Sequence, residues 1–310
     1  MQQPSDSTLS IINVSWNTCD LIEQCLASVY QHSPISEYEV LVVDNASTDN
    51  SAGMMRERFP QVQLIENDEN VGFAKANNQA ILLSNGQYVI LLNPDTQIKP
   101  GALDTLVRFM DENPQAGAAG PKLLNPDGTL QTSCSPTPTL SRELWRLFHQ
   151  DKIRPYGEYD MGTWDLEEPR QVDILQGACL IIRRGVLDQV GLLDEDYFIY
   201  SEEVDLCYRM KKAGWQLYWV PQAEIIHYGG ESTSQVAEDM FLQLYRSKII
   251  FFRKHYGWFS AQIYKLILSV AAITRLMVSP IAWLERPSKR QRHIAVAGYY
   301  RRLLASLPGM

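Results

Sequence analysis

The sequence predicts an α/β fold with an open, twisted, mostly parallel sheet flanked by helices. Over the first 120 residues, short runs rich in β-branched and aliphatic side chains alternate with segments of helical periodicity. Three successive strand–helix units imply parallel strands joined by right-handed crossovers. The predicted strands are residues 9–16, 38–43, 62–66 and 88–92, and the predicted helices are residues 21–29, residues 74–84 and one that begins near Ser47 or Thr48.

The predicted strand at residues 88–92 ends at Asn93-Pro94-Asp95. Pro94 has no N–H for the ladder, so the strand must stop there. In an open α/β sheet, ligands bind outside the carboxyl ends of the strands. An acid at this edge suits a divalent cation that holds a diphosphate, although the tripeptide alone is also typical of a solvated turn.

Polar side chains follow two other predicted strands at the same edge. Asn17 comes after residues 9–16, and Asp44 and Asn45 come after residues 38–43. Each of these groups could serve as a helix cap or turn former, but together they predict one polar crevice. The sequence has no GxxxxGK[ST] and no GxGxxG pattern, so a nucleotide there would be held by carboxylates and a metal ion instead.

Composition is that of an ordinary globular chain. It has 310 residues, of which 45% are hydrophobic and 21% charged, enough for one large α/β domain with an appendage or for two domains. Five scattered cysteines, without a CxxC pair, argue for reduced thiols and against structural zinc. The first residues lack the basic and apolar regions of a signal peptide, so we expect a cytoplasmic protein.

The C-terminal part has the opposite charge to the rest of the chain. From residue 246 onward there are twelve Lys and Arg and one acid, whereas the preceding residues carry sixteen basic and thirty-five acidic side chains. Two apolar runs, LILSVAAIT and LMVSPIAWL, flank Arg275, and each is about half the ~20 residues that a membrane span needs. We therefore predict a basic, amphipathic helical tail over residues 241–310 on an anionic membrane surface. The alternative is a soluble helical pair.

A series of motifs resembles the family 2 glycosyltransferases of GT-A fold, in particular the bacterial rhamnosyltransferase-like branch of surface-polysaccharide and O-antigen synthesis. The resemblance covers roughly residues 8–235 and implies a GT-A domain over residues 8–240. Residues 8–120 would bind the nucleotide sugar, and residues 121–240 would bind the acceptor and supply the base. The matching strings are VSWN, VVDNASTDNS, NVGFAKANNQAI, LLNPDTQIKPGAL, LLNPDGTLQ, GACLIIRRGVLDQVGLLDEDYFIYSEEVDLCYRMKKAGW and IIHYGGEST.

The resemblance implies a donor pocket and a metal site. Asn93-Pro94-Asp95 stands where the family has Asp-x-Asp, so contact with Mg²⁺ or Mn²⁺ would rest mainly on Asp95, because an amide oxygen is a weaker ligand than a carboxylate. His227 occupies a late histidine position that adds a metal ligand in some relatives, and a structural role is the alternative. The implied donor-binding residues are Asn17, Asp44, Asn45, Gly72, Phe73, Ala74, Asn78, Asn93 and Gly177.

Three acids, Glu202, Glu203 and Asp205, form the second constellation. An inverting transfer needs a base, and mutual repulsion among three acids would raise at least one pKa toward neutrality. The family pattern Glu-Asp-x-Asp places the base at Glu203, where this chain has the longer side chain. Glu202 and Asp205 would meet acceptor or phosphate, or else stabilise a helix N-terminus. Arg183 or Arg184 would neutralise diphosphate, or else be a surface charge.

The sequence thus predicts an inverting glycosyltransferase that uses a dTDP- or UDP-linked sugar, with rhamnose as the first expectation. The acceptor would be a glycan or an isoprenoid-diphosphate-linked glycan at the inner face of the cell membrane, where the enzyme would be peripheral. No nucleic-acid partner is expected. The alternatives are a sugar nucleotidyltransferase, although its Gly-rich loop is absent after the first strand, and a non-catalytic glycan- or nucleotide-binding scaffold on the membrane.

Overall fold

The computed structural model describes residues 9–34, 37–229, 236–278 and 287–310, with only the backbone of residues 287–293. Part of the expected run LMVSPIAWL and the end of the string IIHYGGEST lie outside these residues. The chain packs into two compact units. The first comprises residues 1–137, 160–198 and 202–235, and the second comprises residues 138–159, 199–201 and 236–310. The second unit therefore includes residues 138–159, which the sequence division assigned to the acceptor half of the first domain.

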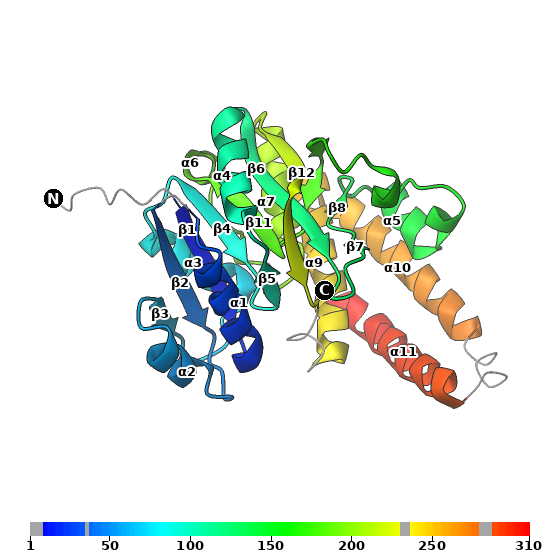
Figure 1. The fold of residues 1–310 in the computed structure, drawn as a ribbon. Helices are drawn as coiled ribbons and strands as arrows, with labels where there is room; N and C mark the ends of the chain where they lie inside the picture. Colours follow the sequence, from blue (N-terminus) through cyan, green and yellow to red (C-terminus); the bar gives the residue numbers. More distant parts are fainter. Residues whose placement is uncertain (1–8, 35–36, 230–235, 279–286) are drawn as a thin grey trace. The chain divides into compact units, whose positions relative to one another are not determined.

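A mixed sheet with strand order β3-β2-β1-β4-β11-β6-β12-β5 forms the centre of the first unit (Figure 1). The strands β3, β2, β1 and β4 are parallel, as the alternating pattern predicts. β11 runs antiparallel to both β4 and β6, and β5 runs antiparallel to β12. The strands on this path are β1 (Leu9–Ser15), β2 (Tyr38–Asp44), β3 (Gln63–Glu66), β4 (Tyr88–Leu92), β5 (Thr96–Ile98), β6 (Ala116–Leu124), β11 (Cys179–Arg183) and β12 (Gln216–His227).

Short strands extend this sheet or pair beside it. β7 (Leu130–Gln131) pairs with β6, and β9 (Arg170–Val172) pairs with β12. β8 (Cys134–Ser135) and β10 (Ile174–Leu175) form a separate two-stranded sheet. The β7–β6 pairing keeps Gln131 at the main sheet, and Gly177 lies just before β11 of that sheet.

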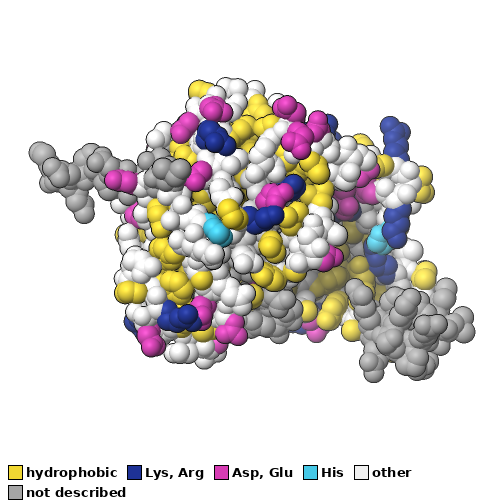
Figure 2. Space-filling model, in the orientation of Figure 1, with side chains coloured by type: hydrophobic (Ala, Val, Ile, Leu, Met, Phe, Trp, Pro, Cys, Tyr) yellow, Lys and Arg dark blue, Asp and Glu magenta, His cyan; other side chains and the backbone are white. Residues whose placement is uncertain are grey.

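Helices flank the sheet because the central strands are apolar on both faces. All five residues of β4 and all seven of β1 are buried, as strands of a doubly covered sheet must be. Acidic and basic side chains are interspersed on the face that Figure 2 shows. Lys99 and Lys122 of the first unit form ion pairs with Glu224. The helices of this unit are α1 (Cys19–Gln31), α2 (Ser51–Arg58), α3 (Phe73–Leu83), α4 (Ala102–Glu112), α6 (Arg184–Val190) and α7 (Glu202–Lys212).

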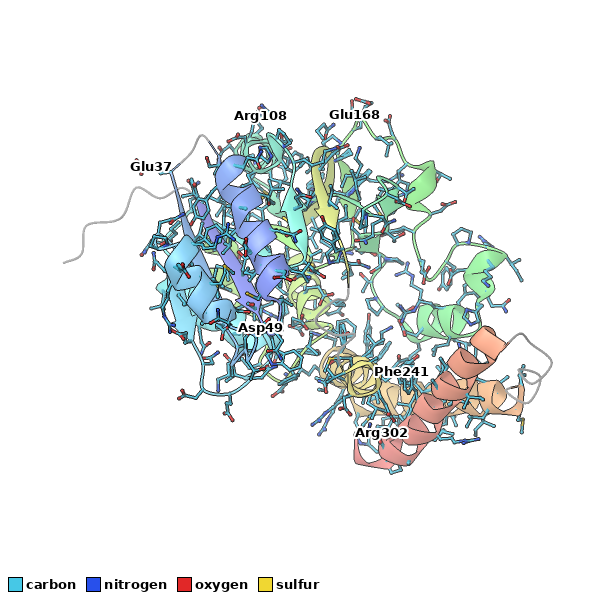
Figure 3. All side chains as sticks on the ribbon, turned by 60° about the horizontal axis from the view of Figure 1, so that its bottom comes forward. Glu37, Asp49, Arg108, Glu168, Phe241 and Arg302 are labelled. Atoms are coloured by element: carbon cyan, nitrogen blue, oxygen red, sulfur yellow. The ribbon has the colours of Figure 1, made fainter. Side chains whose placement is uncertain are left out.

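The second unit is helical and has its own core. Its α-helices in the described residues are α5 (Leu140–Leu147), α9 (Ala237–Tyr256), α10 (Trp258–Val278) and α11 (Pro287–Ser306). It also has the short 3₁₀ helices η1 (Gln150–Lys152) and η4 (Leu307–Gly309). The 3₁₀ helix η2 (Met161–Thr163) belongs to the first unit. Phe241 of α9 packs against two tyrosines of α11, and Arg302 of α11 forms ion pairs with Glu238 and Asp239 (Figure 3). Apolar packing and exposed ion pairs thus hold α9 and α11 together.

A buried carboxylate links three helices of this second unit. Glu143 of α5 accepts hydrogen bonds from Lys248 of α9 at 2.9 Å and from Tyr264 of α10 at 3.0 Å. Burial raises the pKa of Glu143 above its ordinary value, so its partners offset a desolvation cost. Removing one partner would leave the buried carboxylate with less compensation for its desolvation.

Candidate active site

The carboxyl ends of β1 and β2 are joined by direct hydrogen bonds between their loops. The Asn17 backbone N–H donates to Ser47 Oγ at 2.9 Å, and Asn17 Oδ1 accepts from the Thr48 backbone N–H at 2.8 Å. Asn17 and Ala46 both have left-handed backbones, with φ of 51° and 63°. Such conformations are unfavourable for an alanine by about 1 kcal/mol, and strained backbone of this kind gathers at functional sites. The strain therefore supports a binding role for this edge.

Asp44 lies at the end of β2 with one carboxylate oxygen unsatisfied. Its Oδ2 accepts from the Ser47 backbone N–H at 3.0 Å. Its Oδ1 is buried and accepts no hydrogen bond from the described residues. Because buried acceptors almost always have partners, this oxygen is a candidate for a donor group of a bound nucleoside.

Asn45 uses its amide to shape the loop before α3. Its Oδ1 accepts from the Val71 backbone N–H and from the Asn67 side chain, both at 3.1 Å, and its Nδ2 donates to Asn70 Oδ1 at 2.8 Å. The side chain is 2% exposed. Asn45 therefore orients the residues that precede Gly72, whatever contact it makes with a ligand.

Gly72 lies where the chain passes close to Phe198. Its φ is +89°, and a Cβ atom there would lie 2.7 Å from the Phe198 carbonyl oxygen and ring. The next backbone N–H, of Phe73, donates to that same carbonyl at 2.6 Å. Only glycine allows both the left-handed backbone and this approach. Ala74 follows as a fully buried residue in the first turn of α3.

Asp95 and His227 meet at the ends of β4 and β12. Asp95 Oδ1 lies 3.3 Å from His227 Nε2, and the Tyr228 backbone N–H donates to the Asp95 carbonyl at 2.9 Å. Asn93 lies two residues before Asp95 and is half-buried. Among the described residues, no group of three His, Cys, Asp or Glu side chains could hold a metal ion, so a cation here would take ligands from a carboxylate, an imidazole and its substrate.

The environment of His227 fits a cation. His227 Nδ1 lies 2.6 Å from Gln131 Oε1, and Gln131 Nε2 donates to Asn125 Oδ1 at 3.0 Å. This amide orientation makes Nδ1 the donor, so a neutral imidazole presents the lone pair of Nε2 to Asp95 Oδ1. Two acceptors that face each other at 3.3 Å repel unless a proton or a metal ion lies between them. The donor atoms of Asp95 and His227 therefore fit a divalent cation.

Glu203 lies beside the segment that borders the end of β4. A Cβ atom on Gly177 would lie 3.7 Å from Cβ and Cγ of Glu203, and the next residue, Ala178, accepts a hydrogen bond from the Asn93 backbone N–H at 2.9 Å. Gly177 and Ala178 thus connect the predicted metal loop to the predicted base. The structure brings these two sites together although they are about a hundred residues apart in the sequence.

Glu202 is the more buried of the two adjacent glutamates. Burial, with a smaller contribution from the charge of Glu203, raises the pKa of Glu202 well above its ordinary value. Its Oε2 has no hydrogen-bond partner in the described part of the chain. Tyr200 and Ser201, which precede α7, have φ of 67° and 68°, so a strained turn presents the two acids.

Asp205 and the two arginines are engaged with the protein. Asp205 is 1% exposed, pairs with Arg209 at 2.7 Å, and accepts from the Tyr197 hydroxyl at 3.4 Å. Arg183 is paired with Tyr88, at the end of β4 opposite to Asn93, and donates to the Met110 carbonyl of α4 at 2.8 Å. The structure therefore does not bring Arg183 to the site.

Arg184 is also remote from Asp95. Its guanidinium donates to the Gly86 carbonyl and to Ser84 Oγ, both at 2.6 Å, and both acceptors lie just past the end of α3. Arg184 thus stabilises the connection between α3 and β4. The sequence around Arg184 does not indicate which end of the neighbouring strand its long side chain reaches.

Sequence reasoning missed Gln131 and Arg209. Gln131 ends the string LLNPDGTLQ, which carried the resemblance without a role for its last residue. Arg209 lies four residues after Asp205, a spacing that predicts a helical ion pair. Neither the three backbone acceptors of Arg209 nor the pairing of Gln131 with His227 has a signal in a single sequence.

Comparisons with known proteins show the family to which the chain belongs. Residues 10–191 match the family described as Glycosyl transferase family 2. The chain is 32% identical over 299 residues to N-acetylglucosaminyl-diphospho-decaprenol L-rhamnosyltransferase of Mycobacterium tuberculosis, covering 87% of this chain and 92% of that protein. It is 25% identical over 178 residues to rhamnosyltransferase WbbL of Escherichia coli strain K12, covering 51% of this chain and 61% of that one.

Among solved structures, the chain is similar to the mannosyltransferase PcManGT of Pyrobaculum calidifontis in complex with GDP-Man and Mn²⁺. The TM-score is 0.60 at 17% identity, covering 97% of this chain and 86% of that one. Fold and site together define a glycosyltransferase of GT-A fold. The chain belongs to glycosyl transferase family 2, as its resemblance predicts. It is therefore an enzyme of that family and is neither a sugar nucleotidyltransferase nor a non-catalytic scaffold.

Proposed function

We propose that this enzyme transfers a sugar, with inversion, from a nucleoside-diphospho-sugar held by Asp44 and Asp95 to an acceptor hydroxyl activated by Glu203. The observation that carries the proposal is the connection from Asn93 through Ala178 and Gly177 to Glu203, which supports a single site for the predicted metal loop and the predicted base. An acid remote from this loop could not act on a sugar whose diphosphate is bound there.

Each group has a role that follows from its surroundings. Glu203 would remove the proton of the acceptor hydroxyl as an oxocarbenium-like centre develops at the anomeric carbon. Asp95 and His227 would hold a divalent ion, which when bound neutralises charge on the leaving diphosphate. Asp44 would accept a hydrogen bond from the nucleoside through its unsatisfied oxygen. Burial raises the pKa of Glu202 well above its ordinary value, so Glu202 would donate a hydrogen bond to an acceptor whenever it is protonated.

The donor and acceptor are proposed from the relatives. The mycobacterial relative is named as an L-rhamnosyltransferase that acts on an N-acetylglucosaminyl-diphospho-decaprenol. We propose dTDP-rhamnose as donor, with a UDP-sugar as the second candidate, and a glycan linked to an isoprenoid diphosphate as acceptor. The product would enter cell-surface polysaccharide synthesis.

The direct experiment is a screen of nucleotide sugars against the purified protein, with Mn²⁺ and with EDTA. Binding and slow hydrolysis are measured first, and transfer to a short-chain polyprenyl-diphosphate-GlcNAc is measured second. The proposal expects one nucleotide sugar to be turned over in a metal-dependent way. If none is bound or hydrolysed under either condition, the proposal fails.

A lipid-linked acceptor requires contact with a membrane, and α10 offers a surface for it. Residues 258–278 form one 21-residue helix, which by length and composition could cross a membrane. Its apolar side chains at spacings of three and four residues are 44–77% exposed. They are Phe259, Ile263, Leu266, Val270, Ile273 and Met277.

The other face of α10 is packed inside the second unit. Tyr264 and Leu268 are buried, and Arg275 donates to the Leu147 carbonyl at 2.5 Å. A helix fixed in this way would have to unpack to cross a bilayer, so we propose that it lies in the interface with its exposed stripe in the lipid. The excess of Lys and Arg from residue 246 onward is complementary to anionic lipid at the inner face of the cell membrane.

Sedimentation with vesicles of anionic lipid tests this orientation. Replacing Ile263, Leu266 and Val270 by serine should weaken binding by about a hundredfold, because each side chain loses roughly 1 kcal/mol or more of burial. The matched control replaces Leu82 and Leu83, which are exposed on α3, and should bind as the wild type does. Equal binding of the two variants would refute a role for the stripe.

A further inference from the structure

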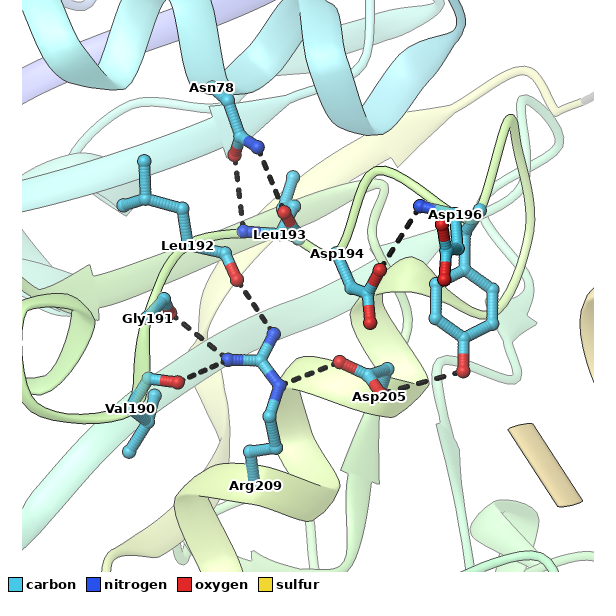
Figure 4. Close-up of polar contacts among 10 residues, drawn as sticks. Asn78, Val190, Gly191, Leu192, Leu193, Asp194, Asp196, Asp205 and Arg209 are labelled. Atoms are coloured by element: carbon cyan, nitrogen blue, oxygen red, sulfur yellow. Dashed lines mark hydrogen bonds and ion pairs between the residues drawn. The ribbon is translucent and has the colours of Figure 1, made fainter. Parts of the chain in front are cut away.

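The segment between α6 and the acids of α7 is held on one side by Arg209. Its Nη1 donates to the carbonyls of Val190 and Gly191, at 2.6 and 3.1 Å, and its Nη2 donates to the Leu192 carbonyl at 2.7 Å (Figure 4). Asp205 holds the guanidinium by accepting from Nε at 2.7 Å. One arginine therefore fixes three consecutive carbonyls, and the planar fork that does so cannot be replaced by a lysine.

Asn78 of α3 holds the same segment from the other side. Its Oδ1 accepts from the Leu193 backbone N–H at 3.1 Å, and its Nδ2 donates to the Leu193 carbonyl at 2.8 Å and to Glu195 Oε1 at 2.9 Å. Figure 4 shows the amide directed at the backbone of this residue. Both hydrogens of the amide nitrogen are used, and the side chain is 5% exposed, so the amide is occupied by the segment itself.

This segment continues to both halves of the active site. The carbonyl of Phe198 accepts the hydrogen bond from the backbone N–H of Phe73, which follows Gly72 at the start of α3. Four residues beyond Phe198 the chain begins α7, which carries Glu203. A shift of residues 190–198 would therefore displace the Gly72 loop and the strained turn before Glu203 together.

We infer that Asn78 and Arg209 form a two-sided clamp on residues 190–198 and are positioning residues for the transfer step. Asn78 acts through Leu193 instead of touching the donor as a ligand, and Arg209 acts through the carbonyls of residues 190–192 with Asp205 as its holder. The inference rests on the proposed function, in which Glu203 is the base. It assigns a role to Asp205 as well, as part of the clamp.

Steady-state kinetics of Arg209→Lys, Asn78→Asp and the double variant test the clamp. Arg209→Lys keeps a charge for Asp205 but loses the fork, and Asn78→Asp turns a donated hydrogen bond into a repulsion with the Leu193 carbonyl. Each should lower kcat about tenfold or more while the KM for the sugar nucleotide changes less than about threefold, since small displacements of reacting groups have effects of this size. Because both residues hold one segment, the fold loss of kcat in the double variant should be clearly smaller than the product of the two single-variant fold losses.

The control is Arg108→Lys, since Arg108 is an exposed arginine on α4 (Figure 3) and its variant should match the wild type. Unchanged kcat in both clamp variants, after correction for the folded fraction, would overturn the inference. So would a raised KM with unchanged kcat in Asn78→Asp, because that result would make Asn78 a donor ligand.

Hydrogen exchange separates this inference from the proposed function. The clamp predicts faster exchange of the backbone amides of residues 191–198 in either variant, with β1 unchanged, whether or not any sugar nucleotide is turned over. Wild-type protection in both variants would refute the clamp even if transfer is confirmed. Absence of turnover by the wild type would refute the proposed function and leave the clamp to be decided by exchange alone.

Discussion

The metal end and the base end of this site are built in different ways. Asp95 lies at the end of a fully buried strand, and its backbone and side chain are tied to β12 through Tyr228 and His227. Glu203 lies in the first turn of a helix that follows two left-handed residues. The sheet itself orders the first group, whereas the second depends on contacts from outside its own element.

The charge balance of the two ends differs as well. Asp95 has a histidine within 3.3 Å, whereas Glu202 and Glu203 are adjacent acids, and one of them is buried with a raised pKa. A metal site needs ligands that are held in place, as Gln131 holds the imidazole of His227. A base needs a carboxylate that gains by taking up a proton, which concentrated negative charge provides. The difference between the two ends thus matches the difference in their chemistry.

The largest expected effect comes from the base. Glu203→Gln keeps the shape and removes the proton acceptor, so transfer should fall by about 10²–10⁴-fold while the KM for the nucleotide sugar stays near that of the wild type. Glu203→Asp restores the carboxylate but sets it back by one methylene, so we expect its rate of transfer to lie between those of the wild type and Glu203→Gln.

The matched control for these variants is Glu168→Gln, an exposed acid outside the site (Figure 3). It should transfer at the wild-type rate. If Glu203→Gln also did so, the base would have to be another group and the contrast between the two ends would lose its basis.

The smallest expected effect concerns stability at the base end. The folded-state pKa of Glu202 is raised above 4.5, so the folded state favours the neutral acid, and stability present below about pH 4.5 is lost as the pH rises toward the folded pKa. Glu202→Gln does not titrate, and it should raise Tm by roughly 3 °C or more at pH 8 with little effect at pH 4.5.

Thermal unfolding of both proteins between pH 4 and pH 8 checks this. An advantage of the glutamine variant that is independent of pH would mean that Glu202 ionises freely in the folded protein. Glu143→Gln is a useful comparison, because that carboxylate is also buried but lies beside Lys248 and Tyr264.

Much of the first half of the fold followed from sequence pattern. The predicted strands at residues 9–16, 38–43 and 88–92 agree with the observed ones to within a residue, because these strands are largely buried and rich in aliphatic side chains. The helix expected at residues 74–84 is α3, Phe73–Leu83. The antiparallel direction of β11 was not predictable, since an apolar run looks the same in either direction.

The candidate site could be predicted by residue type but not by contact. Strand ends gave Asp44 and Asp95, because topology alone brings them to one edge. The contact of Gly177 with Glu203 depends on how α7 packs, and the use of Arg183 on α4 carbonyls depends on which end of β11 it occupies. Long-range contacts of this kind leave no local pattern. The sequence therefore predicts ligand contacts for Arg183 and Asn78, whereas their polar atoms bind groups of the protein itself.

The most direct test of the account is a calorimetric titration of dTDP and UDP, with and without Mn²⁺, into Asp95→Asn and Glu203→Gln. The account predicts that Mn²⁺ tightens nucleotide binding about tenfold or more in the wild type and in Glu203→Gln, and that Asp95→Asn loses this effect. Retention of the full Mn²⁺ effect by Asp95→Asn, or its loss in Glu203→Gln, would contradict the division of the site into a metal end and a base end.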